Sequence, residues 1–159
     1  MILVTVGTQL PFDRLIRMMD EIAPELDKPV KAQIGKSSYT PENIEWMVNI
    51  DPVDFDRLFG EASIIVAHAG IGTVLTAKRF SKPIILVARK ADLGEHRNDH
   101  QNATVGQLRG RPGVYVAADQ EELKALLKSD LKAASADGED DETRSTLIEN
   151  VRLFIEEKL

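Results

Sequence analysis

The chain has 159 residues, of which 43% are hydrophobic and 29% charged, and it contains no cysteine. This length suits one domain whose core is large enough to be stable without cross-links. The absence of cysteine excludes a disulfide scaffold, a thiolate zinc site, an iron–sulfur centre and a cysteine nucleophile. The start MILVTVGTQL has no basic leader and no apolar run approaches the roughly 18 residues of a membrane span, so we expect neither a signal peptide nor a transmembrane helix.

Charge is unevenly distributed along the chain, whose 20 Lys and Arg and 26 Asp and Glu residues give a net charge of −6. The stretch Ser135–Glu142 holds five acids and no base, which predicts a mobile linker. The stretch Lys78–Arg111 carries eight bases against three acids. Such a run usually forms a solvated face, but this one follows a glycine-rich turn at which an anion is expected. The acidic balance and the 5% aromatic content disfavour nucleic acid as a partner.

Short apolar runs alternate with amphipathic segments of helix length. In chain order, the apolar runs predict strands at Ile2–Val6, Val30–Ile34, Ile44–Val48, Ser63–Ala67, Pro83–Ala88 and Gly113–Val116. The segments between and after them predict helices at Phe12–Ile22, Val53–Phe59, Thr73–Phe80, about Arg97–Leu108, Gln120–Lys128 and Glu142–Glu157.

This alternation predicts an α/β fold with a doubly wound, mainly parallel, Rossmann-like sheet. We assign residues 1–134 to this domain, residues 135–142 to an acidic linker and residues 143–159 to a C-terminal helix. In such a sheet, ligands bind at the carboxyl ends of the strands, near the point where the strand order reverses. The loops that follow the first, second, fourth and fifth predicted strands are therefore the candidate site segments.

The segment HAGIGT, His68–Thr73, joins a predicted strand to a predicted helix. A glycine turn at a helix N-terminus exposes backbone N–H groups and the positive end of the helix dipole, which together bind phosphate. Gly70 and Gly72 admit an anion to the backbone because no Cβ obstructs it, and the Thr73 hydroxyl either caps the helix or bonds the same anion. The alternative is an ordinary turn with Thr73 as its N-cap. The spacing matches neither a Walker A loop nor a dinucleotide fingerprint, which disfavours a nicotinamide dehydrogenase.

A second polar segment, GEHRNDHQNA, follows the fifth predicted strand. Its donors and acceptors, among them Glu95, Asn98, His100 and Gln101, suit a ligand rich in hydroxyls, such as a sugar or a ribose. His96 and His100 stand four residues apart, as metal ligands can, but the sequence offers no well-placed third ligand and we predict no metal site. The alternative is a polar helix start that is capped by one of its own Asn or Asp side chains.

Both segments together resemble a known family. The order of these features resembles the donor-nucleotide site of GT-B glycosyltransferases, above all the C-terminal domain of glycosyltransferase family 28. The features are the turn HAG-x-G-T, a helix, an apolar strand that begins with KPI, and a polar loop that ends in HQ. The start ILVTVGTQLPFDRL is similar to the small subunits of two-subunit enzymes in this group, the eukaryotic lipid-linked N-acetylglucosaminyltransferase and bacterial exopolysaccharide glycosyltransferases. GEHRNDHQ is most similar to the bacterial type, and the resemblance extends to about Ala118.

This resemblance implies a set of substrate-binding residues. Those that would hold the donor diphosphate are His68, Gly70, Gly72 and Thr73. Those that would contact hydroxyls of the transferred sugar are His100 and Gln101, and those that would line the opposite side of the cleft are Gly7 and Thr8. Thr76 stands where family members often carry an acid that binds the nucleotide ribose, and its neutral hydroxyl would make a weaker hydrogen bond.

The resemblance also implies a function. The chain would be the donor-binding subunit of an inverting, metal-independent UDP-sugar glycosyltransferase, a hexosyltransferase acting on a lipid-linked acceptor in exopolysaccharide or glycolipid biosynthesis. A complete GT-B enzyme has two α/β domains, so we expect a membrane-anchored partner subunit to supply the acceptor site and the general base. We assign this chain no catalytic residue and no cofactor, and expect it to be cytoplasmic and peripheral at the membrane through that partner.

Two alternatives remain open. The first is a non-catalytic module that binds a nucleotide sugar through the same glycine turn. The second is a hydrolase or epimerase of the same fold, in which His68 or His100 carries out acid–base chemistry. UDP release by the isolated chain would favour the second alternative, and binding without turnover under every condition would favour the first.

Overall fold

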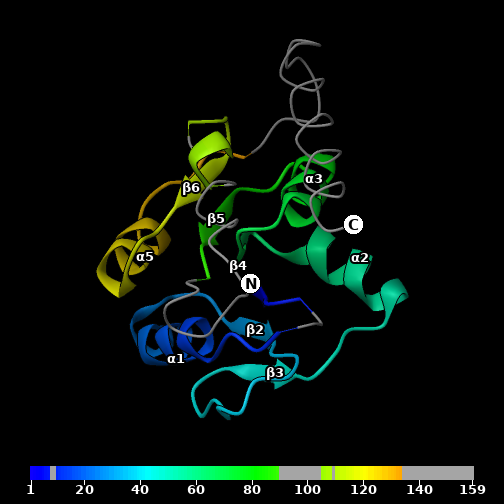
Figure 1. Cartoon of the computed structure of the whole chain (residues 1–159), viewed down its shortest axis with the longest axis vertical. Helices are drawn as coiled ribbons and strands as arrows, with labels where there is room; N and C mark the ends of the chain where they lie inside the picture. Colours follow the sequence, from blue (N-terminus) through cyan, green and yellow to red (C-terminus); the bar gives the residue numbers. More distant parts are fainter. Residues whose placement is uncertain (8–9, 90–104, 109, 134–159) are drawn as a thin grey trace.

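The computed structural model describes residues 1–7, 10–89, 105–108 and 110–133. Within these residues, six parallel strands form one sheet in the order β3-β2-β1-β4-β5-β6 (Figure 1). Their bounds are β1 Ile2–Thr5, β2 Val30–Gln33, β3 Glu45–Met47, β4 Ile64–His68, β5 Ile84–Val87 and β6 Val114–Val116. Each predicted strand is confirmed, because every end lies within about one residue of its predicted position.

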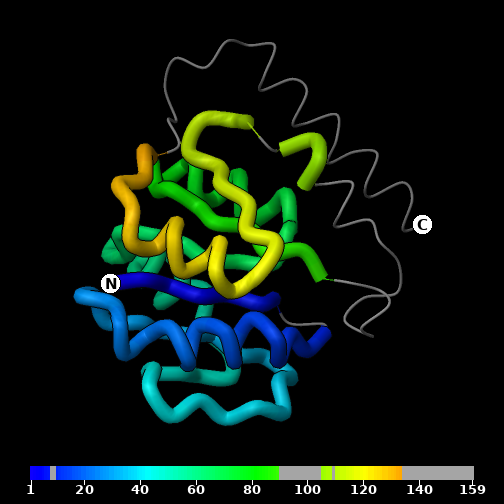
Figure 2. Tube along the Cα trace, turned by 90° about the vertical axis from the view of Figure 1, so that its left-hand side faces the viewer, coloured from blue at the N-terminus to red at the C-terminus, as the bar shows by residue number. Residues whose placement is uncertain are grey.

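Helices cover both faces of the sheet. Their bounds are α1 Asp13–Ile22, α2 Pro52–Glu61, α3 Ile71–Arg79 and α5 Gln120–Leu127, and a short 3-10 helix, η1 Ala23–Glu25, extends α1. Helices α1 and α5 lie on one face and α2 and α3 on the other (Figure 2). Residues 105–108 are helical and belong to the helix predicted to end at Leu108. The rest of that helix, the predicted linker and the predicted C-terminal helix lie outside the described residues.

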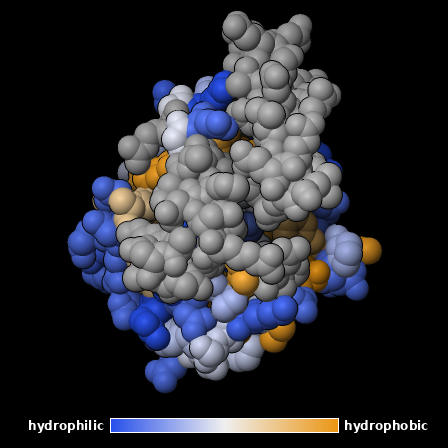
Figure 3. Space-filling view, in the orientation of Figure 1, coloured by the Kyte–Doolittle hydropathy of each residue, from blue (hydrophilic) through white to orange (hydrophobic). Residues whose placement is uncertain are grey.

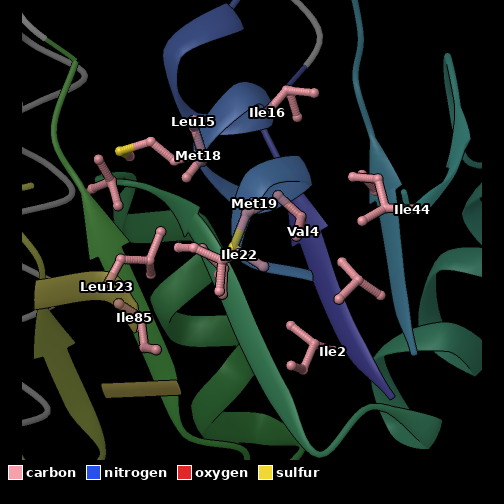
Figure 4. Packing of buried hydrophobic residues seen from close by; sticks show 14 of the residues in the cluster. Ile2, Val4, Leu15, Ile16, Met18, Met19, Ile22, Ile44, Ile85 and Leu123 are labelled. Carbon is pink, nitrogen blue, oxygen red and sulfur yellow. The ribbon is translucent and has the colours of Figure 1, made fainter. Parts of the chain in front are cut away.

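The strands are apolar on both sides because both faces of the sheet are covered. Ile2 and Val4 of β1 pack in the cluster beneath α1, where Leu15 is fully buried (Figure 4). Leu3, between them in the sequence, packs on the opposite face in the cluster that contains Phe59 of α2. Full burial of side chains of this size contributes about 1.5–3 kcal/mol each. The two clusters therefore fix the sheet between its helix layers.

The strand order reverses between β1 and β4. From β1 the chain proceeds outward through β2 to β3, and from β4 it proceeds outward in the other direction through β5 to β6. Pairing of Thr5 with Ala67 sets the carboxyl ends of β1 and β4 side by side. This is the doubly wound, Rossmann-like topology that the sequence predicts, and its switch point lies where two of the predicted site loops begin.

Large apolar side chains are exposed at Trp46 (40%), Val48 (51%) and Val53 (81%). These residues lie in or just after the edge strand β3 and at the start of α2. The coloured surface in Figure 3 shows small hydrophobic spots among mostly hydrophilic side chains. Within the described part of the chain, no helix combines the length and the apolar character that crossing a membrane requires.

Candidate functional site

The loops that follow β1 and β4 meet at the switch point. Gly7 lies just after β1, and His68 is the last residue of β4. A Cβ added to Gly7 would lie 3.2 Å from Cε1 of His68, which is tighter than ordinary contact. Gly7 also has a φ of +78°, a left-handed conformation that glycine adopts without strain. The structure thus brings together two predicted site residues that are far apart in the sequence.

The His68 imidazole also occupies the space beside Gly70. A Cβ at Gly70 would lie 2.8 Å from Nε2 of His68, closer than Cβ atoms approach in real structures. Glycine at this position therefore makes room for the imidazole. This reason differs from the sequence expectation that Gly70 is needed to admit a ligand, and it means that Gly7 and Gly70 both accommodate one side chain.

The N-terminus of α3 follows directly. Its N-cap is Gly70, which has no side chain to accept a hydrogen bond, and its first turn contains no acid. Thr73 lies inside this turn and not at the N-cap, so the alternative of a threonine cap is wrong. Gly72 is exposed, and among the described residues a Cβ there would meet no atom within 4 Å apart from the backbone of its own helix. Amides of the first turn and the positive end of the helix dipole are therefore open to an anion beside Gly72.

Thr76 is one turn further along α3. Its hydroxyl donates a hydrogen bond of 3.0 Å to the carbonyl oxygen of Gly72. A hydroxyl so engaged retains lone pairs that can accept from a second group. The structure therefore places Thr76 on the same part of the helix as Gly72, and leaves its hydroxyl oxygen available as an acceptor rather than as a donor.

Gln33, at the end of β2, is a buried residue that connects the carboxyl ends of neighbouring strands through hydrogen bonds. The sequence analysis did not predict this role. Its side chain is only 3% exposed. Its Oε1 accepts from the Thr5 hydroxyl at 3.0 Å and from the Val6 amide at 3.1 Å, and its Nε2 donates to the carbonyl oxygens of Gly7 at 2.9 Å and Val48 at 3.2 Å. All four bonds help to fix the carboxyl ends of β1, β2 and β3. The signal that could have indicated this role is a glutamine within the predicted strand VKAQI, where an apolar residue is expected.

Arg89, two residues after β5, is the second residue that the sequence analysis missed. It belongs to the basic stretch expected to form a solvated face, yet it is only 5% exposed. Its Nη2 donates to the carbonyl oxygens of Val6 and, at 2.8 Å, of Leu10, and its guanidinium carbon lies 5.2 Å from the Phe12 ring centroid. The expectation of a solvated face is therefore wrong at Arg89, which packs beneath the loop that contains Gly7.

The loop after β2 is tied to the first turn of α1. Asp13 accepts hydrogen bonds from the Ser37 hydroxyl at 2.6 Å, from the Ser38 amide at 3.1 Å and from the Ser38 hydroxyl. Burial raises the pKa of the Asp13 carboxyl, but the hydrogen bonds from Ser37 and Ser38 and the charge of Arg17 outweigh it, and the net pKa lies below its usual value. The N-terminus of α1 thus carries an ionised acid.

Five residues predicted to bind substrate lie outside the described part of the chain: Thr8, Glu95, Asn98, His100 and Gln101. His96, the other member of the histidine pair considered for a metal, lies outside it as well. Within residues 1–7, 10–89, 105–108 and 110–133, no group of three or more His, Asp or Glu side chains is arranged to hold a metal ion. The geometry of the site therefore rests on Gly7, His68 and the start of α3.

Comparison with known proteins gives sugar-transferase relatives in both sequence and structure. The UDP-N-acetylglucosamine transferase subunit ALG13 of Yarrowia lipolytica is 28% identical over 143 residues, which cover 79% of this chain and 70% of that protein. An NMR solution structure of ALG13 superposes with a TM-score of 0.58 at 15% identity, covering 84% of this chain and 88% of the other. The crystal structure of the glycotransferase of kitacinnamycin gives a TM-score of 0.57 at 18% identity, but this chain, of which 80% is covered, spans only 34% of that one.

These structural likenesses show the shared fold, a Rossmann-like half of a GT-B glycosyltransferase. A family model describes the sequence almost from end to end, matching residues 1–156. The chain therefore belongs to the family of the glycosyltransferase family 28 C-terminal domain.

Proposed function

We propose that this chain is the donor-binding subunit of an inverting, metal-independent glycosyltransferase that uses a UDP-sugar. The observation that carries the proposal is the N-terminus of α3, which has no side-chain cap, no acid in its first turn and an open space beside Gly72. This N-terminus lies at the switch point of the sheet, where α/β folds bind their ligands. Family membership supports a sugar transferase, and the likeness to the ALG13 subunit supports UDP as the nucleotide.

The diphosphate of the donor would lie against the first turn of α3. When the acceptor oxygen attacks the sugar carbon, the bond from that carbon to the phosphate oxygen breaks and UDP leaves with additional negative charge. Amide groups and the helix dipole that already point at this position stabilise that charge without reorganising. The residues proposed to contact the donor diphosphate are His68, Gly70, Gly72 and Thr73, with Gly7 and Thr8 across the cleft.

The sugar and the ribose would be held by polar side chains. Thr76, one turn into α3, is proposed to accept a hydrogen bond from the ribose. The sugar contacts are assigned to the segment after β5 that contains Glu95, Asn98, His100 and Gln101. Gln101→Ala should then weaken UDP-sugar binding by about 1–3 kcal/mol, the usual cost of an unpaired polar contact, while the affinity for UDP alone changes little.

A pair of glycine variants tests the diphosphate site. Gly72→Val should abolish the binding of UDP in a calorimetric titration, because the branched side chain fills the position of the phosphate. Gly60→Val is the matched control, since Gly60 is also exposed, also helical and also has no atom within 4 Å of an added Cβ. Unchanged UDP affinity in a folded Gly72→Val protein would refute the proposed site.

We further propose that a membrane-anchored partner subunit supplies the acceptor site and the general base, and that this chain is cytoplasmic and peripheral at the membrane. Co-expression with that partner should move the chain into the membrane fraction and create transfer to a lipid-linked acceptor. Activity of the complex should survive EDTA, and loss of activity with rescue by Mg²⁺ would contradict a metal-independent mechanism. Complete transfer by the purified isolated chain would overturn the two-subunit proposal.

A further inference from the structure

The guanidinium of Arg89 is enclosed by main-chain and aromatic groups of the loop after β1. One nitrogen, Nη2, donates both to the Val6 carbonyl oxygen and to that of Leu10. The same guanidinium lies over the ring of Phe12, which is itself fully buried. Val6, Leu10 and Phe12, which lie between β1 and α1, therefore all contact one permanently charged side chain that follows the end of β5.

These bonds determine how the peptide groups of the loop are oriented. In a trans peptide the C=O and the N–H point in opposite directions, so the Val6 carbonyl that faces Arg89 turns the Gly7 N–H away from it. The next carbonyl, that of Gly7, is held by Nε2 of Gln33 at 2.9 Å. The carbonyls of Val6 and Gly7 are thus held from opposite sides of β1. Arg89, which follows β5, holds the first, and Gln33 of β2 holds the second.

The same contacts fix the point at which the chain leaves β5. Arg14 of α1 donates from its Nη2 to the carbonyl oxygen of Ala88 at 2.8 Å, and its guanidinium also lies over Phe12, at 5.3 Å from the ring centroid. Ala88 and Arg89 directly precede residues 90–101 in the sequence, the segment that ends in His100 and Gln101. The contacts of Arg14, Arg89 and Phe12 therefore connect the backbone after β1 with the backbone at the end of β5.

We propose that Arg89 is a positioning residue of the donor site, which fixes the backbone at Val6 and Gly7 where Gly7 packs against His68. This inference rests on the proposed function, because the ligand whose binding it controls is the UDP moiety. Arginine suits the role because its planar guanidinium donates to several carbonyls while stacking on an aromatic ring, which a lysine ammonium does not reproduce.

The test compares Arg89→Met and Arg89→Lys with the wild-type full-length chain. UDP affinity is measured by calorimetry well below each melting temperature, and the backbone amide shifts of Gly7 and Leu10 are recorded without ligand. Arg89→Met should weaken UDP binding at least about tenfold, because the backbone at Val6 and Gly7 is no longer held in one orientation, and should shift both amides. Arg89→Lys should restore part of the affinity, because it keeps the charge and a donor.

Asp20→Asn is the matched control for loss of a buried polar network. Asp20 is 2% exposed and accepts hydrogen bonds from the Tyr39 hydroxyl and the Asn43 amide, both at 2.6 Å, in the loop before β3. This variant should lower the melting temperature and leave UDP affinity unchanged. If Arg89→Met also lowers only the melting temperature, Arg89 is a structural residue and the inference is overturned while the proposed function stands. Absence of UDP binding by the wild-type chain would overturn both.

Discussion

Two helices that start at the same edge of the sheet begin in opposite ways. Helix α5 has Asp119 as its N-cap, whose carboxylate accepts from the Glu122 amide at 2.8 Å, while the Glu122 carboxylate accepts from the Ala118 amide at 2.7 Å. Helix α3 has Gly70 as its N-cap and no acid in its first turn. The N-terminus of α5 satisfies amides with its own side chains, and that of α3 has no side-chain cap.

The difference follows the topology of the sheet. Helix α3 follows β4 at the switch point, whereas α5 follows the edge strand β6. Relative to a glycine N-cap, an Asp cap stabilises a helix by only about a few tenths of a kcal/mol, so the start of α3 lacks a small stabilisation that α5 has. Helix α2, after the other edge strand β3, is also capped, with Asp51 accepting from the Val53 amide at 3.1 Å. Both helices that follow an edge strand, α2 and α5, thus have a side-chain cap, whereas α1 and α3, which follow the central strands β1 and β4, have none.

Placing an acid in the first turn of α3 would make it resemble α5. Thr73→Asp should weaken UDP binding by about 3 kcal/mol, the repulsion of two charges about 5 Å apart at an effective dielectric constant near 20. The same change should stabilise the unliganded chain by about 0.3–1 kcal/mol through the helix dipole. Calorimetric titration and thermal unfolding measure the two effects. Thr73→Asn separates charge from shape, and equal losses of affinity for both variants would contradict an electrostatic role.

Adding a methyl group at each of the two glycines of α3 should have opposite effects on stability. Gly70→Ala should destabilise the chain by about 1–3 kcal/mol, because its Cβ would overlap the His68 imidazole. Gly72→Ala should stabilise it by about 0.4–1 kcal/mol, because its Cβ meets open space and the unfolded chain loses freedom. Urea unfolding measures both values. Destabilisation by Gly72→Ala would show that this glycine serves the fold and not a ligand.

Removing the cap of α5 should affect only stability. Asp119→Ala should cost about 1 kcal/mol in urea unfolding, because the Glu122 amide loses its acceptor. UDP affinity should remain that of the wild type, because α5 begins beyond the edge strand β6. A loss of affinity comparable to that of Thr73→Asp would place the ligand at the wrong helix for this account.

Asp20, a buried acid away from α3, should contribute to stability in a way that depends on pH. Burial raises the pKa of the Asp20 carboxyl, but hydrogen bonds from Tyr39, Asn43 and Glu42 outweigh it, and the net pKa lies below the ordinary value of 3.8. Its contribution to stability is therefore present above that value and is lost as the pH falls through the lower folded-state pKa. The stability difference between wild type and Asp20→Asn should thus be constant near neutral pH and shrink below about pH 4. A difference that does not change with pH would mean that the Asp20 charge contributes nothing.

The sequence predicted the sheet and the switch point because both depend on local patterns. Runs such as ILVTV are typical of strands that are buried on both faces of a parallel sheet. It did not predict the roles of Gln33 and Arg89, because the groups to which their side chains bond lie far away in the sequence and are brought close only by the fold. It assigned Gly70 to a ligand, since no sequence pattern indicates that an imidazole would occupy the space beside it. Gly72, whose open surroundings agree with the expected role, remains a predicted ligand contact.

The central claim is that the open N-terminus of α3 receives the diphosphate of UDP. The most direct measurement is a titration of the uniformly ¹⁵N-labelled chain with UDP, following backbone amide shifts. The account predicts the largest shifts at Ile71, Gly72 and Thr73 and none at Gln120 and the rest of the capped first turn of α5. Saturable UDP binding that leaves the amides of α3 unmoved, or that moves those of α5 instead, would contradict it.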